Sequence, residues 1–440
     1  MPFENGKAGS KSFAYGVRRI VNTTTWCRCM KDINIALAAV GGLILLLGLL
    51  SRPVDRSWLS APLVAFFMGV LLSPDGLGWM HPQEWGNTQV MLEEVARLTL
   101  GISLMGIALR LPSKFPLTHW RPVLLLLAIA MPAMFLISAL LTYWTLGLPW
   151  LIAMLVGACI CATDPVIASS IVTGGVAKEN LPGGFRHLLS TESGANDGLA
   201  YPLVLLPILL LTMPMEAAWS EWFAKTWLRE VGGGIVIGGL LGWASGRALE
   251  WAEARRYLDQ PSFLAITLAL TILVLGVGKL LGTNSILAVF VAGLAFDQVV
   301  GGQERSEEDN VQEAVNLFFT LPVFVLFGLI APWSEWVALG WNGVLLAVLV
   351  LLLRRLPVIL LLRPLLPPAR EKRISFVMGW FGPIGVSALF YAVLISSRTG
   401  HDIAWVVGSL IVFASILAHG VTAAPFAKLY HHKTQDSKVR

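Results

Sequence analysis

The chain has 440 residues, of which 56% are hydrophobic and only 13% are charged. A typical soluble domain carries about 25% charged residues, so this chain lacks the polar surface to cover a soluble globule of its size. The net charge of +5 gathers in loops and tails. Together these values exclude a soluble enzyme, a disordered protein, a coiled coil and a nucleic-acid binder. They indicate an all-α protein that crosses a membrane many times.

Three segments divide the chain. Residues 1–32 form a polar, basic N-terminal tail without the apolar core of a secretory signal peptide. Residues 33–427 form one membrane domain, and residues 428–440 form a short polar C-terminal tail. Apolar runs in the membrane domain predict thirteen membrane-spanning helices, at residues 33–50, 58–73, 91–109, 122–146, 150–173, 187–212, 230–249, 261–280, 284–300, 313–331, 341–362, 374–396 and 403–427.

Lys and Arg residues between the spans predict the orientation of the chain. One set of alternate loops, taken with the C-terminal tail, holds nineteen of them, and the other set holds three. The positive-inside rule places the first set, and with it the C-terminus, in the cytoplasm. Thirteen spans then put the N-terminus outside, whereas the six basic residues of its own tail favour the cytoplasm. Twelve spans, with 91–109 not crossing, would remove this conflict, so the side of the N-terminus stays open.

Thirteen spans also permit an internal repeat. Spans one to six and eight to thirteen would form two six-helix repeats of opposite orientation, joined by span seven. The fifth span of each repeat then contains a helix-breaking sequence, Ala162-Thr163-Asp164-Pro165 in the first and Gly382-Pro383-Ile384-Gly385 in the second. Paired broken helices at matching positions are typical of secondary transporters whose substrate site lies at the membrane midplane.

The first of these breaks offers oxygen ligands. Asp164 lies deep in an apolar segment, where a carboxylate costs about 2.5–3.5 kcal/mol and must face protein or water. Pro165 frees backbone carbonyls nearby, and Thr163 adds a hydroxyl. Hard oxygen donors of this kind suit small cations that shed water. Asp164 could equally cap the second half of its own broken helix, and the sequence leaves both roles open.

Span six carries two carboxylates, a hydroxyl and an amide, from Glu192, Ser193, Asn196 and Asp197. Ser193, Asn196 and Asp197 share a helix face, because they are three and four residues apart. An ionisable residue inside a membrane is a functional hypothesis by default, and polar contact between helices is the structural alternative. Glu192 is expected to pair with a buried cation, because a second free carboxylate would repel Asp197.

Span eleven supplies two candidates for that cation. Arg354 and Arg355 lie side by side well inside an apolar run. One of them could extend its charge to the membrane interface, but both doing so from mid-span is a poorer explanation. We therefore expect one arginine to bond Glu192 in a fork geometry and to hold spans six and eleven together.

At this point five motifs in order resemble the sodium/proton antiporter branch of the monovalent cation:proton antiporter superfamily. The resemblance extends over about residues 33–427. The motifs are Ala162–Pro165, Glu192–Gly198 with its Asn-Asp pair, Asn284–Leu294, Gly382–Ser387 and His419–Pro425.

This resemblance implies roles for the polar residues of spans five and six. Asp197 would bind the cation and the proton alternately, Thr163 and Asp164 would complete the site, and Ser193 would be a cation ligand. Asn196 occupies the place where electrogenic members of the family carry a second aspartate. One titratable carboxylate suggests one proton exchanged for each cation.

The resemblance also implies an ion pair and an assembly. Glu192 would pair with an arginine of span eleven, and the family register places that arginine at Arg354, next to Arg355. Members are homodimers in which a core bundle, here with spans five, six and twelve, slides against a dimerisation scaffold. Ile384 stands where many members have an arginine, in a form that resembles a fungal plasma-membrane subgroup and its bacterial relatives.

The predicted function is exchange of a monovalent cation, Na⁺ and with it Li⁺, for protons across the cell membrane, with no cofactor and no nucleic-acid partner. K⁺/H⁺ exchange on the same fold is the alternative, since the ligand set alone does not fix ion size. An ion channel needs a continuous pore, against which paired broken helices argue. A membrane enzyme finds no support, because the loops hold no His-rich metal cluster, nucleophile elbow or phosphate loop.

Overall fold

The computed structural model describes residues 23–50, 60–164, 167, 181–257, 263–301 and 305–438. All regular elements within these ranges are helices, which confirms the prediction of an all-α protein. A helix satisfies the backbone N–H and C=O groups of its own segment, as an apolar medium demands.

Residues up to Thr212 form α1 (Thr23–Leu49), α3 (Ala61–Leu72), η1 (Pro82–Trp85), α4 (Thr88–Arg110), α5 (Phe115–Thr118), α6 (Trp120–Leu125), η2 (Leu126–Ala130), α7 (Met131–Leu146), α8 (Trp150–Cys159) and α11 (Gly183–Thr212). The later residues form α12 (Met215–Glu221), η3 (Trp222–Gly232), α13 (Gly233–Ala254), α14 (Phe263–Leu280), α15 (Ser285–Val300), α16 (Arg305–Leu329), α17 (Trp333–Leu353), α18 (Leu356–Leu362), η4 (Arg363–Leu365), η5 (Pro367–Ala369), α19 (Lys372–Trp380), α20 (Val386–Thr399) and α21 (Ile403–Lys438).

Each predicted span coincides at least in part with helical residues, and residues 165–166 and 168–173 of the span expected at 150–173 lie outside the described residues. Among the described residues, six helices are long and apolar enough to cross a membrane, and five more are shorter apolar helices. Two predicted spans, 91–109 and 230–249, coincide with α4 and with η3 and α13, which fit neither description. Several helices long enough to cross a membrane are therefore present, and the count of thirteen crossings stays a prediction.

Helices end at both predicted breaks. The helix α8 ends at Cys159, and the chain runs on without regular structure to Asp164. The helix α19 ends at Trp380, and α20 begins only at Val386. Pro165, the expected breaking residue of the first span, lies outside the described residues. The structure also shows an interruption that was not predicted. The span expected at 341–362 is divided at Arg354 and Arg355 into α17 and α18.

The two predicted breaks meet in space. The backbone N–H of Asp164 donates a hydrogen bond of 2.8 Å to the carbonyl oxygen of Pro383. The Asp164 carboxylate accepts a second bond, of 2.6 Å, from the N–H of Val386, which lies 222 residues further along the chain. The two breaks therefore contact each other directly, while their equivalence in two inverted repeats stays a prediction.

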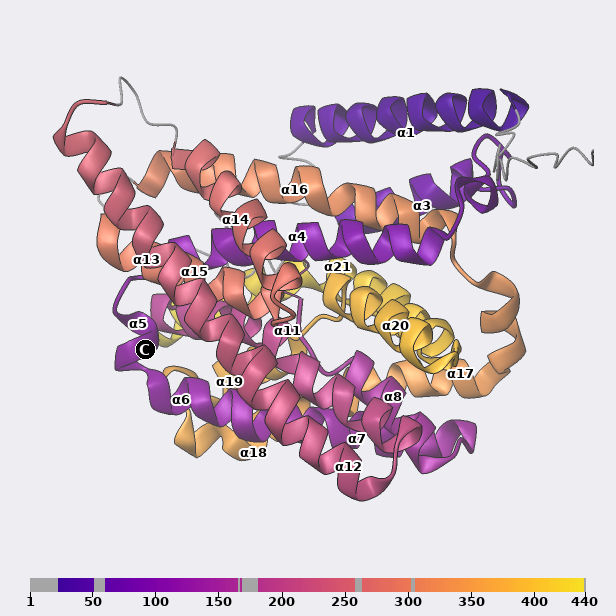
Figure 1. Cartoon of the computed structure of the whole chain (residues 1–440). Coiled ribbons are helices and arrows are strands. Elements are labelled where there is room, and N and C mark those ends of the chain that lie inside the picture. The colour runs from indigo at the N-terminus through magenta and orange to yellow at the C-terminus, as the bar shows by residue number, and fades with distance from the viewer. Residues whose placement is uncertain are drawn as a thin grey trace, which may run out of the picture.

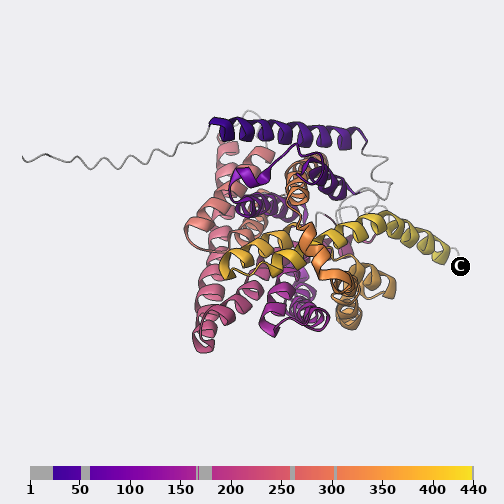
Figure 2. The ribbon, with the colours of Figure 1, turned by 90° about the vertical axis from the view of Figure 1, so that its right-hand side faces the viewer.

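The remaining helices pack around this meeting point. α3, α4 and α16 run side by side, and α1 lies across α3 and α16 at one edge of the bundle (Figure 1). The long helix α21 packs against α20 and α17 and then leaves the bundle at its C-terminal end (Figure 2). α11 contacts α8, α15 and α20, which brings its polar residues beside both breaks.

Close backbone contact holds α13 against α15. Four buried glycines, spaced four residues apart, lie along the same face of α13: Gly234, Gly238, Gly242 and Gly246. A Cβ atom at Gly238 would lie 2.2 Å from the carbonyl oxygen of Ala288, so a larger residue would force the two helices apart. Small residues allow this approach where membrane helices pack on one another.

Candidate functional site

The candidate site lies where α11 passes the two breaks. Glu192, Ser193, Asn196 and Asp197 are all buried on this helix, although the first and last of them are carboxylates. Thr163 and Asp164 approach from the first break, and Arg354 and Arg355 from the interruption between α17 and α18. The structure thus brings together the residues predicted for the site that lie in its described part.

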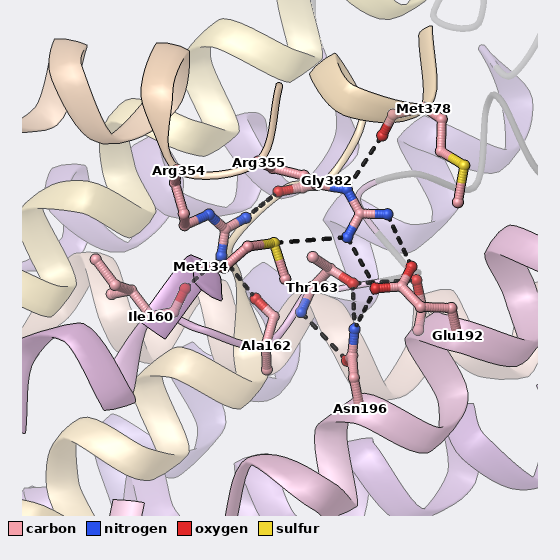
Figure 3. A network of polar contacts seen from close by, with 11 residues as sticks. Met134, Ile160, Ala162, Thr163, Glu192, Asn196, Arg354, Arg355, Met378 and Gly382 are labelled. Atoms are coloured by element: carbon pink, nitrogen blue, oxygen red, sulfur yellow. Dashed lines mark hydrogen bonds and ion pairs between the residues drawn. The ribbon is translucent and has the colours of Figure 1, made fainter. Parts of the chain in front are cut away.

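Asn196 ties α11 to the first break. Its amide nitrogen donates hydrogen bonds to the Thr163 hydroxyl at 2.6 Å and to a Glu192 carboxylate oxygen at 3.0 Å. Its amide oxygen accepts a bond of 3.3 Å from the backbone N–H of Thr163. The Thr163 hydroxyl also lies 3.3 Å from the hydroxyl of Ser193. Both ends of the Asn196 amide are therefore used within the protein (Figure 3).

Glu192 pairs with Arg355. Two guanidinium nitrogens of Arg355 donate to the two carboxylate oxygens of Glu192, each at 2.8 Å. A third nitrogen donates to the backbone carbonyl of Met378 at 3.1 Å, just before the second break. This bidentate geometry is the fork that was predicted, but the register that placed the partner at Arg354 is wrong. Arg355 faces α11, and Arg354 faces the broken helices (Figure 3).

Arg354 bonds backbone carbonyls of both breaks. Its guanidinium donates to the carbonyl oxygens of Ile160 and Ala162, the latter at 3.1 Å, and to that of Gly382. Ile160 is the C-cap residue of α8, at the end where helical carbonyls lack partners and carry the negative end of the helix dipole. A buried guanidinium compensates that charge and connects the first break to the second. This role was not predicted, because a sequence does not show which carbonyls a break leaves unpaired.

Asp164 caps a helix beyond the other break. Its carboxylate accepts the Val386 N–H at the N-terminus of α20, the helix that follows the later break. The second half of its own span lies outside the described residues, so the cap expected there stays a prediction. Gly385 makes this approach possible, since a Cβ atom there would lie 2.2 Å from the Asp164 carboxylate oxygen. A Cβ atom at Gly382 would likewise lie 2.1 Å from Cδ of Arg355. Both glycines are thus required by close contacts.

Asp197 differs from its neighbours. Its side chain is 1% exposed, and neither carboxylate oxygen has a hydrogen-bond partner among the residues that the structure describes. Its backbone carbonyl accepts a hydrogen bond of 2.5 Å from the hydroxyl of Tyr391. A buried carboxylate without partners is strongly disfavoured as a bare charge, so it must take up a cation or a proton.

Helix α21 supports the second break from behind. The Ser415 hydroxyl accepts a hydrogen bond of 2.8 Å from the N–H of Ile384. The ring nitrogens of His419 lie 2.9 Å from the carbonyl oxygens of Ser415 and Trp380. In the sequence, His419 stands out only as part of a motif, and the contacts of Ser415 and His419 with the second break were not predicted. A histidine and a serine in an apolar run are the features that could have indicated them.

The donors around Asp197 are carboxylate and hydroxyl oxygens, the ligands that alkali cations prefer. Within the described residues, no group of three or more His, Cys, Asp and Glu side chains could hold a metal ion.

A family model described as "Sodium/hydrogen exchanger, transmembrane" matches residues 41–429. The chain belongs to this family. The family predicted from the five motifs is therefore confirmed. Exchangers are transporters, so the expectation that the chain is not an enzyme is confirmed as well.

Individual exchangers agree with this membership. The chain is 36% identical over 375 residues to Na(+)/H(+) antiporter 2 of Zygosaccharomyces rouxii, which covers 83% of this chain and 46% of the relative. It is 35% identical over 371 residues to a Na(+)/H(+) antiporter of Saccharomyces cerevisiae, covering 82% and 38%. The chain thus spans less than half the length of these two relatives.

A solved structure shows the same fold. The sodium proton antiporter MjNhaP1 from Methanocaldococcus jannaschii superimposes with a TM-score of 0.69 at 18% identity, covering 91% of this chain and 99% of that one. The exchanger fold predicted for this chain is therefore confirmed.

Proposed function

We propose that this chain is a secondary antiporter that exchanges Na⁺, and also Li⁺, for protons across the cell membrane. The observation that carries the proposal is the Asp197 carboxylate, buried beside both breaks with two oxygens that no described residue satisfies. Its relatives named as Na(+)/H(+) antiporters support the same choice of ion.

One carboxylate can serve both ions because they compete for it. A proton neutralises Asp197, and a cation replaces that proton by direct coordination, so the two cannot occupy the group together. Neither state leaves a bare buried charge, whereas the empty ionised site is disfavoured. Exchange follows if the site crosses the membrane only in its two neutral states.

The neighbouring charges support a ratio of one proton to one cation. Glu192 is bound to Arg355, and Asn196 carries no charge. Asp164 lies at the N-terminus of α20, where the helix dipole favours its ionised form. Asp197 is then the one carboxylate among these that exchanges its proton, and the cycle moves no net charge.

The same contacts suggest which part moves. Arg354 joins both breaks, Asp164 joins the first break to α20, and the Glu192–Arg355 pair joins α11 to the interruption between α17 and α18. These elements would move as one core bundle against the other helices, in an elevator-type cycle within a homodimer. The C-terminus would face the cytoplasm, on the side of the Lys- and Arg-rich loops.

Proton flux in proteoliposomes tests this function. We expect a Na⁺ or Li⁺ gradient to drive protons in the opposite direction. The rate should saturate with cation concentration, and no proton movement should occur without an opposing cation gradient. Asp197→Asn should abolish it, while Asp297→Asn, at a buried aspartate of α15, should retain it. A K⁺ gradient as effective as Na⁺ would favour the potassium alternative. Cation flux that continues without any proton movement in the opposite direction would mean a channel. Proton flux in a folded Asp197→Asn variant would overturn the proposal.

A further inference from the structure

Three buried oxygens near the centre of the site have no hydrogen-bond partner among the described residues. Two belong to the Asp197 carboxylate, and the third is the hydroxyl of Ser387, which is 0% exposed. Ser387 lies in the first turn of α20, directly after the second break. An unsatisfied buried hydroxyl costs free energy, so its position beside an unsatisfied carboxylate calls for an explanation.

Helix geometry directs Ser387 toward Asp197. Ser387 and Tyr391 are four residues apart on α20 and therefore share a face. That face meets α11 at Asp197, because the Tyr391 hydroxyl bonds the Asp197 carbonyl at 2.5 Å. The Ser387 hydroxyl and the Asp197 carboxylate are both buried, on two helices that contact each other, and neither has a hydrogen-bond partner among the described residues.

The first turn of α20 is held firmly in this position. The Val386 N–H is bonded to the Asp164 carboxylate at 2.6 Å, and the Ile384 N–H is bonded to the Ser415 hydroxyl at 2.8 Å. A helical serine commonly bonds the carbonyl four residues earlier, which here belongs to Pro383. That carbonyl instead accepts the N–H of Asp164 at 2.8 Å, and the Ser387 hydroxyl stays unpartnered.

The other candidate ligands are more fully engaged than Ser387. The Asn196 amide bonds Thr163 through both its nitrogen and its oxygen, and the Thr163 hydroxyl accepts one of those bonds. The Ser193 hydroxyl lies 3.3 Å from that of Thr163. Ser387 is therefore the hydroxyl of the site that the protein leaves open.

We propose that Ser387 is a ligand of the transported cation, supplied by the second broken helix to complete the coordination by Asp197. The inference rests on the proposed function and adds a residue to its site. In the cation-bound state the hydroxyl oxygen coordinates the ion. In the protonated state the same oxygen accepts a hydrogen bond from the Asp197 carboxyl. A hydroxyl held by a fixed helix turn favours a cation of one size, so Ser387 also contributes to ion selectivity.

Variants of Ser387 test this assignment. We expect Ser387→Ala, and equally Ser387→Cys with its soft sulfur, to raise the Na⁺ concentration for half-maximal exchange by about tenfold, because one oxygen ligand is lost. The ratio of half-maximal Na⁺ to K⁺ concentrations should change as well, which a merely structural role would not cause. Ser138→Ala is the matched control, since Ser138 on α7 is also fully buried with an unpartnered hydroxyl. It should leave both quantities unchanged.

Cation-dependent thermal stabilisation of the purified protein in detergent provides a second readout that is independent of transport. The protective effect of Na⁺ should need about tenfold higher concentration in Ser387→Ala. Wild-type Na⁺ dependence in a folded Ser387→Ala variant would overturn the proposal. If that variant does not fold, wild-type Na⁺ dependence in Ser387→Cys would overturn it instead. Absence of any Na⁺ effect in the wild-type protein would contradict the proposed function itself.

Discussion

The buried polar side chains around α11 differ in how completely the protein satisfies them. The nitrogen and oxygen of the Asn196 amide and both oxygens of the Glu192 carboxylate form hydrogen bonds with protein groups. The two arginines bond carbonyls or a carboxylate. Among the described residues, the Asp197 carboxylate has no such bonds. The proposed exchange needs a group of this kind, because an oxygen already bonded within the protein must break that bond before it binds an ion.

The Glu192–Arg355 ion pair should contribute to the stability of the folded protein. Glu192→Gln and Arg355→Ala should each destabilise the protein by about 3–5 kcal/mol, because each leaves one buried partner uncompensated. The double variant should cost clearly less than the sum of the two. Thermal unfolding in detergent would measure all three proteins.

Arg354→Ala is the control for this cycle. It should couple to Glu192→Gln clearly less than Arg355→Ala does, because Arg354 bonds backbone carbonyls and not Glu192. Additive losses for Glu192 and Arg355, or equally strong coupling between Glu192 and Arg354, would contradict the pairing.

The arrangement of the elements depends on how the broken helices satisfy one another. Each break exposes backbone groups that its own segment cannot bond. Asp164 caps α20, the Pro383 carbonyl accepts the Asp164 N–H, and Arg354 bonds carbonyls of both breaks. The two interruptions are thus stable together, since each supplies partners to the other.

A glycine of the second break tests this mutual support. Gly385→Ala places a methyl group where the Asp164 carboxylate lies, so the cap on α20 must move. We expect a loss of about 1–3 kcal/mol in stability, as for other overpacked sites, and a strong fall in transport. Gly276→Ala on α14, where a Cβ atom would meet nothing within 4 Å, should be neutral. Normal transport by Gly385→Ala would show that the cap does not matter.

Much of this arrangement could be predicted from particular residues. Apolar runs located the helices, because a bilayer requires long apolar segments. Asp164 and the Gly382–Gly385 sequence located the breaks, because such residues are costly inside a membrane helix. The partner of Glu192 was missed by one residue, since Arg354 and Arg355 give the same signal and only their packing separates them. Ser387 was also missed, because a serine is an ordinary residue in a helix until its surroundings are known.

In the whole molecule, the fold places the unpartnered Asp197 carboxylate beside two breaks that hydrogen-bond each other. The chain spans less than half the length of the Zygosaccharomyces rouxii and Saccharomyces cerevisiae antiporters. The exchange cycle proposed here depends only on residues within the family match at 41–429.

The proposed stoichiometry determines how the rate of exchange responds to the membrane potential. A cycle that moved one net charge would gain or lose about 2.3 kcal/mol per 100 mV of membrane potential. With one proton exchanged for one Na⁺, turnover should not respond to a potential imposed by potassium and valinomycin across proteoliposomes. A marked response of the initial proton flux would mean that a second group exchanges protons. Asp164 would then be the first residue to examine.

Proton release on cation binding measures whether Asp197 gives up a proton when it binds Na⁺. Na⁺ would be added to the purified protein in weakly buffered detergent, and the released protons measured against the bound cation. We expect about one proton per bound Na⁺ for the wild-type protein and for Asp297→Asn, and none for a folded Asp197→Asn variant. Wild-type proton release from Asp197→Asn would contradict it, because another group would then exchange the proton.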